Sequence, residues 1–130
     1  MNQPTRLFDC LALQLKNASQ HVMLAGKEDG VWKKYTTEEV SQIVNRLSAG
    51  LLKMGISNGE NTSEGRDKIA VISRNRPEWL MLDLAVQQIG AVLTPVYPTI
   101  NVNELEFVLK DAAVKIVFVN DQGLFDKVNE

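Results

Sequence analysis

At 130 residues, the chain is long enough for one domain of ordinary size with its own hydrophobic core. Apolar residues make up 45% of it and charged residues 23%, a balance typical of a soluble globular protein and not of a disordered one. The net charge is -2, so the overall charge does not favour nucleic-acid binding. The only adjacent basic pair, Lys33-Lys34, is expected to lie in a solvated hairpin.

The single cysteine, Cys10, excludes an internal disulfide and a multi-cysteine zinc site. Its neighbours from Leu7 to Leu13 are largely apolar, so we expect a small buried side chain, with a reactive thiol as the alternative. The N-terminus lacks the apolar run and cleavage site of a secretory signal, and no segment approaches the length of a transmembrane span. These features predict a cytoplasmic protein.

The first third of the chain predicts a helix, a hairpin and a second helix. Apolar residues at helical spacing indicate a helix over residues 6–17. Residues 21–24 and 31–35 are expected to form the two arms of a hairpin, with turn residues between them at 26–30. Thr36 and Glu39 predict a capping box at the start of a long amphipathic helix, which ends at Met54-Gly55.

The remainder alternates between apolar strands and helices. Residues 57–67 are polar and predict a mobile surface loop, whose glycines match no phosphate-binding motif. Asn75 is expected to cap the helix that begins near Pro77, and Asn101 or Asn103 the helix that ends at Lys110. Strands are predicted at 68–73, 92–98 and 115–119, with Pro95 at a sheet edge, strand end or bulge, and another helix begins near residue 122.

This order predicts an α/β fold: a three-layer β-α-β-α-β unit on a parallel sheet, preceded by a helix and a hairpin. A sheet of only three strands that are apolar on both faces is not expected to be stable by itself. We therefore expect residues 1–130 to be a fragment of a larger domain.

No pattern of reactive side chains predicts catalysis or metal binding, and we assign no catalytic, cofactor-binding or metal residue. His21 is the only histidine, which leaves no usual zinc ligand set and favours a structural or surface role. The pairs Glu38-Glu39 and Glu104/Glu106 are explained by the preference of helix starts for negative charge. Trp79 is expected to pack in the core.

Three ordered motifs nevertheless resemble the N-terminal region of the adenylate-forming (AMP-binding) enzymes. They are Asn75-Arg76-Pro77-Glu78-Trp79, Asp83-Leu84-Ala85 and Gly90-Ala91-Val92. The continuation Pro95-Val96-Tyr97-Pro98-Thr99 is most similar to the long-chain fatty-acid–CoA ligase branch. The resemblance divides the chain into an N-terminal helix and the start of the hairpin at 1–31, a family-like core at 32–121, and the start of a further helix at 122–130.

The resemblance implies a parent ligase, cytoplasmic, with peripheral attachment to a membrane left open. It would join a fatty acid to CoA through an acyl-adenylate, consuming ATP with Mg²⁺ and releasing AMP and pyrophosphate. The family's phosphate loop, nucleotide-binding motifs and catalytic lysine lie downstream of this region, so the 130 residues alone are expected to be inactive and to hold no cofactor. The partners implied are the rest of the enzyme and its substrates.

Three alternatives remain at this point. The chain could be a stand-alone module that binds acyl chains or nucleotide without chemistry. It could be a structural or dimerisation piece, whose exposed apolar sheet edge would favour self-association. It could also come from another adenylate-forming enzyme, such as an aryl-CoA ligase or the adenylation domain of a peptide synthetase.

Overall fold

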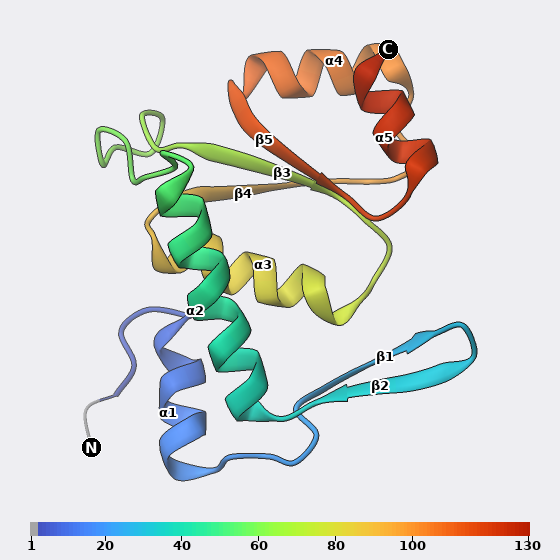
Figure 1. Cartoon of the computed structure of the whole chain (residues 1–130). Coiled ribbons are helices and arrows are strands. Elements are labelled where there is room, and N and C mark those ends of the chain that lie inside the picture. Colours follow the sequence, from blue (N-terminus) through green and yellow to red (C-terminus); the bar gives the residue numbers. More distant parts are fainter. Residues whose placement is uncertain (1–2) are drawn as a thin grey trace.

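The computed structural model describes residues 3–130 and confirms the predicted α/β architecture (Figure 1). The hairpin pairs β1 with β2, and a separate parallel sheet has the strand order β4-β3-β5. The elements are α1 (Asp9–Asn17), β1 (Leu24–Glu28), β2 (Val31–Tyr35), α2 (Thr37–Lys53), β3 (Lys68–Ile72), α3 (Pro77–Gln88), β4 (Val92–Val96), α4 (Val102–Asp111), β5 (Val114–Val119) and α5 (Gln122–Asn129).

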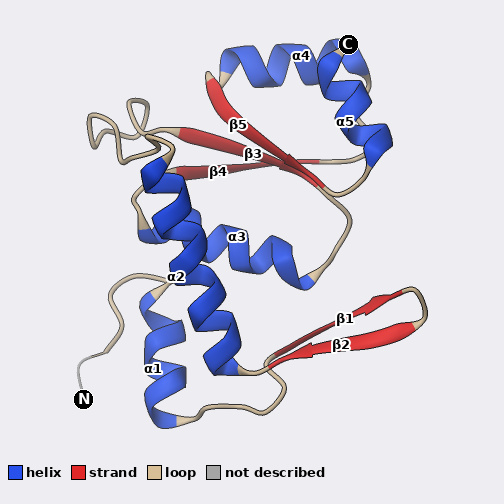
Figure 2. Cartoon of the chain, in the orientation of Figure 1, coloured by secondary structure: helices blue, strands red, loops and turns tan. Residues whose placement is uncertain are grey.

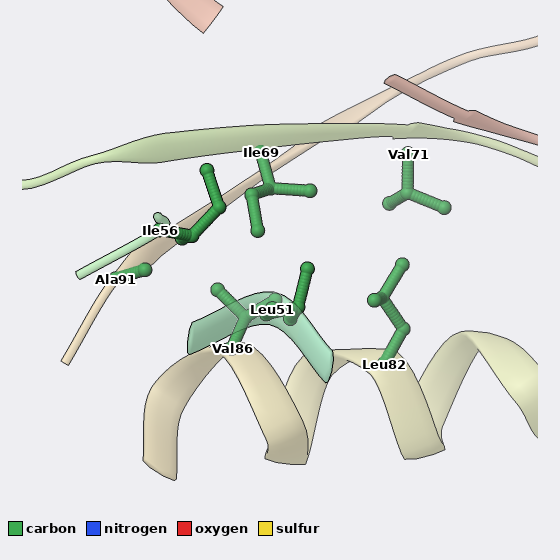
Figure 3. Close-up of a cluster of buried hydrophobic side chains, with 7 residues drawn as sticks. All are labelled: Leu51, Ile56, Ile69, Val71, Leu82, Val86 and Ala91. Atoms are coloured by element: carbon green, nitrogen blue, oxygen red, sulfur yellow. The ribbon is translucent and has the colours of Figure 1, made fainter. Parts of the chain in front are cut away.

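Helices cover both faces of the parallel sheet, which gives three layers (Figure 2). On one face, α2 and α3 enclose the largest apolar cluster, in which Ile69 is fully buried (Figure 3). On the other face, α4 and α5 contribute Leu105 and Leu124, which pack with Ile72 of β3. A third cluster joins α1 and the hairpin to the outer sides of α2 and α3. β3 is therefore the central strand, because neighbouring strands pair with it on both sides and helices cover both of its faces.

The capping box at the start of α2 is confirmed. The Thr36 hydroxyl accepts from the Glu39 backbone N–H at 3.1 Å, and the Glu39 carboxylate accepts from the Thr36 N–H at 2.8 Å. The helix ends at the predicted place, where Gly55 adopts a φ of 85° that disfavours side chains. Asn101 caps α4 as expected, and Pro95 lies on β4, an outer strand.

Three local expectations are wrong. Cys10 is exposed, because α1 turns its neighbour Leu11 into the core and leaves Cys10 on another face of the helix. Asn75 does not cap α3. The capping position is Arg76, whose extended backbone is the conformation favoured before proline, and its side chain makes no capping bond. The first arm of the hairpin was expected at 21–24 and the turn at 26–30. Instead, β1 runs from Leu24 to Glu28, so the turn is only two residues long.

That turn consists of Asp29 and Gly30, with φ angles of 48° and 82°. Positive φ at both central residues is typical of the two-residue turns whose twist matches antiparallel strands. The helix α1 is shorter than expected and begins at Asp9, whose carboxylate pairs with the Arg6 guanidinium in the turn before it.

The hairpin is packed against the start of α3 at a glycine. A Cβ at Gly26 would lie 2.7 Å from Cδ of Pro77, closer than carbon atoms approach in folded proteins. We expect Gly26→Ala to push the hairpin away from α3 and to lower the free energy of unfolding by about 1 to 3 kcal/mol. Urea denaturation measures the loss, and hydrogen exchange of the β1 and β2 amides locates it. Gly50→Ala is the matched control, since nothing lies within 4 Å of that Cβ; an equal loss at Gly50 would contradict this account.

Candidate functional site

The carboxyl edge of the parallel sheet is the part of the fold where a ligand site is expected. The chain passes from β3 to β4 on one side of the sheet and then to β5 on the other side of β3. Ligands of open α/β sheets bind where the strand order reverses in this way. Here Ser73, Arg74 and Asn75 follow β3 and Asn120 follows β5, and the Arg74 N–H donates to Oδ1 of Asn120 at 3.3 Å. The two strand ends are thereby held together.

An apolar cavity of about 270 Å³ opens beside this edge, between the sheet and the helices α2 and α3. Its walls come from Ile43 and Leu47 of α2, Trp79 and Leu82 of α3, and Phe118 of β5. Polar groups that follow the strands, together with the first turn of α3, lie at its margin. The cavity can hold an apolar group next to hydrogen-bonding side chains. Trp79, expected in the core, is half-buried and belongs both to the main apolar cluster and to this wall.

A network around Arg76 ties the hairpin to the carboxyl edge. The guanidinium donates from Nε to Glu78 at 2.7 Å and from Nη2 to Glu28 of β1 at 2.8 Å. The hydroxyl of Tyr35, a buried residue of β2, donates to Oε1 of Glu78 at 3.2 Å. The Arg76 hydrogen bond, with help from Tyr35, lowers the pKa of Glu78 to about 2. At neutral pH this carboxylate is therefore a charged structural group and is poorly suited to general acid or base chemistry.

The lowered pKa of Glu78 predicts a loss of stability in acid. Because the folded pKa lies below the ordinary value of 4.5, the stabilisation is complete above about pH 4.5 and is lost as the pH falls toward about 2. The Glu78 side chain is 40% exposed, which reduces the expected contribution to about 1 kcal/mol. Glu78→Gln should remove it, so urea denaturation should show the variant and the parent converging below pH 3; a constant difference down to pH 2 would contradict the assignment.

The family model of the AMP-binding enzymes matches residues 11–130 of this chain. The chain belongs to the AMP-binding enzyme family.

Individual relatives of this chain agree with that result. It is 31% identical over 90 residues to the long-chain-fatty-acid–CoA ligases FadD15 of Mycobacterium bovis and Mycobacterium tuberculosis, an alignment that covers 69% of this chain and 14% of each ligase. A solved protein of Rhodopseudomonas palustris, assigned as a long-chain-fatty-acid CoA ligase, is 31% identical, with a TM-score of 0.77 over 95% of this chain and 28% of that one.

The N-terminal subdomain of NpsA from Klebsiella oxytoca has the same fold at 21% identity, with a TM-score of 0.66 over 89% of this chain and 28% of that one. This chain therefore spans about a seventh of the curated ligases that it matches and about a quarter of these two solved proteins. The similarity to NpsA, being below 25% identity, concerns the fold alone.

The opposite edge of the sheet holds a buried carboxylate. Asp67, 7% exposed, precedes β3 and accepts from the Ser57 N–H at 2.8 Å and from Nζ of Lys115 at 2.6 Å. The hydrogen bond to Lys115, followed by that of Ser57, lowers the pKa of Asp67. Asp67 thus joins both ends of the 57–67 loop to β5. This gives the loop a polar anchor at its base, which no local sequence pattern predicts.

The other residues singled out in the sequence have ordinary structural roles. His21 is exposed before β1, and Glu39 belongs to the capping box. Glu104 lies in the first turn of α4, and Glu106 pairs with Lys110 one turn along that helix. Within residues 3–130, no three His, Cys, Asp or Glu side chains are grouped so that they could hold a metal ion. In the same range, no helix is long and apolar enough to cross a membrane.

Proposed function

We propose that this chain forms the N-terminal subdomain of a long-chain fatty-acid–CoA ligase. The observation that carries the proposal is the family match over residues 11–130, combined with 31% identity to ligases of which the chain spans only 14%. The parent would convert ATP, a fatty acid and CoA into acyl-CoA, AMP and pyrophosphate through an acyl-adenylate, and would act in the cytoplasm. Its partners would be the rest of the enzyme and these substrates.

In that enzyme the described residues would supply positioning rather than chemistry. The carboxyl edge has hydrogen-bonding groups and a carboxylate already paired with Arg76, while the cavity beside it is apolar. As the family resemblance implies, the 130 residues alone are proposed to bind no cofactor and to make no acyl-adenylate. Pyrophosphate release from ATP and palmitate should equal a blank without protein; release above the blank would contradict this.

A chimera tests the positive part of the proposal. The segment of the Mycobacterium tuberculosis FadD15 ligase that aligns with this chain would be replaced by this chain's own residues. Because the fold is shared and the chemistry would reside elsewhere, we expect palmitate-dependent pyrophosphate release to be retained. A chimera that unfolds cooperatively like the ligase but releases no pyrophosphate would count against the proposal. The reading frame after Glu130 gives an independent check, since a Ser/Thr/Gly-rich loop ending in lysine is expected there.

Two alternatives have specific observations in their favour. The apolar cavity would suit a non-catalytic module that holds an acyl chain or nucleotide, and a flat calorimetric titration with both ATP and acyl-CoA would remove that alternative. The outer strands β4 and β5 have no further strand beside them among the described residues, which would suit a dimerisation piece. A sharp monomer in sedimentation at high protein concentration would remove that one.

A further inference from the structure

The connection between β3 and α3 is short, and it forms part of the carboxyl edge of the sheet. β3 ends at Ile72 and α3 begins at Pro77, so residues 73–76 cross from the sheet to the helix. Arg76, the last of them, has an extended backbone with a φ of -157° and a ψ of 156°, the conformation that a following proline favours. Because β3 and α3 are both packed in the core, a displacement of Arg76 must be absorbed by residues 73–75 alone.

The start of α3 depends on contacts from outside the helix. Arg76 occupies the capping position, and its side chain makes no capping bond. The guanidinium instead meets two carboxylates: Nε donates to Glu78 of α3 at 2.7 Å, and Nη2 donates to Glu28 of β1 at 2.8 Å. Glu28 lies 48 residues earlier in the chain, at the end of the first hairpin strand. A single side chain thus joins the hairpin, the start of the helix and the connection from β3.

This bridge requires the geometry of a guanidinium. Its N–H groups diverge in a planar fork, so Arg76 can hold both carboxylates at once, whereas the ammonium group of a lysine is a point charge. The hairpin also packs directly on the helix start, since a Cβ at Gly26 would lie 2.7 Å from Cδ of Pro77. The packing sets how closely the hairpin approaches α3, and the ion pairs set where Arg76 lies against it.

The other side of the connection contains a reporter of its position. The Arg74 N–H donates to Oδ1 of Asn120, which follows β5, at 3.3 Å. This distance is long for a hydrogen bond from an N–H group, so a small displacement of the connection would break the bond. The rate at which the Arg74 amide exchanges with solvent therefore measures whether the connection is in place.

We propose that Arg76 is a positioning residue through which the hairpin holds the connection from β3 to α3 at the carboxyl edge of the sheet. The hairpin is then a support of that edge. This role goes beyond the proposed function, which gives the hairpin no task. Its consequence for the ligase rests on the proposed function, because the edge would position a ligand only in the assembled enzyme.

Amide exchange in the whole 130-residue chain, followed by NMR, tests the proposal. Glu28→Gln removes the charge at the hairpin end of the bridge. It should speed exchange at the Arg74 amide by about threefold, the size expected for a half-exposed ion pair. Arg76→Lys should have the same effect, and the two changes together should add little, because each breaks the same bridge. The amides of β3 should keep their rates, since the core is not altered.

Asp29→Asn is the matched control. It removes the same charge one residue further along the hairpin, outside the bridge, at a positive φ that asparagine adopts readily. It should leave the exchange of the Arg74 amide unchanged. Unchanged exchange in Glu28→Gln, equal effects of Glu28→Gln and Asp29→Asn, or a rise spread equally over the β3 amides would each overturn the proposal. Circular dichroism verifies that the variants remain folded.

A chimera separates this proposal from the proposed function. Residues 11–130, the range of the family match, would replace the corresponding segment of the Mycobacterium tuberculosis FadD15 ligase. A folded chimera without palmitate-dependent pyrophosphate release would count against the proposed function, while the exchange result would still decide the role of Arg76. In an active chimera, Glu28→Gln should lower kcat/KM about threefold relative to Asp29→Asn. Equal values of kcat/KM in those two variants would overturn the consequence for the ligase.

Discussion

Replacement of Ile69 by alanine is expected to lower the free energy of unfolding by about 4 kcal/mol. Ile69 is fully buried on β3, the central strand of the sheet, where it meets Val86 of α3 and the end of α2 (Figure 3). The truncation removes transfer free energy and also leaves a cavity, because a central strand paired on both sides cannot move inward to fill it. A loss of this size is a large part of the stability of a small domain. Urea denaturation followed by circular dichroism measures it.

Leu52→Ala is the control for this prediction. Leu52 is also an apolar residue in a regular element, but it is 53% exposed on α2. We expect a change within about 0.5 kcal/mol, since an exposed side chain leaves no cavity. If Leu52→Ala costs as much as Ile69→Ala, the assignment of the core to the α2–α3 face of the sheet would be wrong.

Asp67→Asn is expected to lower the free energy of unfolding by about 2 kcal/mol, which is typical of a buried hydrogen bond to a charged group. The amide can still accept from Ser57, but it cannot pair with the Lys115 ammonium. The expected loss depends on pH. The folded pKa of Asp67 lies below its ordinary value, so its contribution is complete above about pH 4 and is lost as the pH falls through the lowered pKa. Urea denaturation at several pH values should therefore show the two proteins converging in acid.

The control for Asp67 is another acid-to-amide change in an ion pair, Glu106→Gln. Glu106 pairs with Lys110 on the surface of α4, with 59% of its side chain exposed. Exposed pairs of this kind contribute little, so no measurable change is expected. If the two variants behave alike, the burial of Asp67 would have no energetic consequence and the loop would be anchored by other contacts.

Much of the fold could be predicted because the relevant signals are local. The capping box at Thr36 is complete within four residues, and the strand at 68–72 is apolar on both faces, as a central parallel strand must be. The errors arose where two local signals competed. Asn75 is a good capping residue, but Pro77 fixes the residue before it in an extended conformation and so sets the start of the helix one residue later. Cys10 has apolar neighbours, but helix geometry turns it outward.

The candidate site could not be predicted in the same way. Glu78 and Tyr35 are 43 residues apart, and Arg76 and Glu28 are 48 apart. No spacing rule connects such pairs, because their contact depends on how the hairpin packs on α3. The family resemblance correctly identified the family from the motif that contains Arg76, yet it could not reveal that this side chain links the hairpin to the sheet.

The two faces of β3 are unequally covered, and this has a consequence for how the molecule opens. Seven buried side chains form the cluster beneath the sheet, and six more join α1, the hairpin, α2 and α3 behind it. Among residues 3–130, three buried side chains, with six partly buried ones packed against them, hold α4 and α5 on the other face of the sheet. The free energy of local opening rises with the buried apolar area that the opening exposes. The C-terminal layer is therefore expected to be the thermodynamically weaker side of the sheet and to open before the remainder.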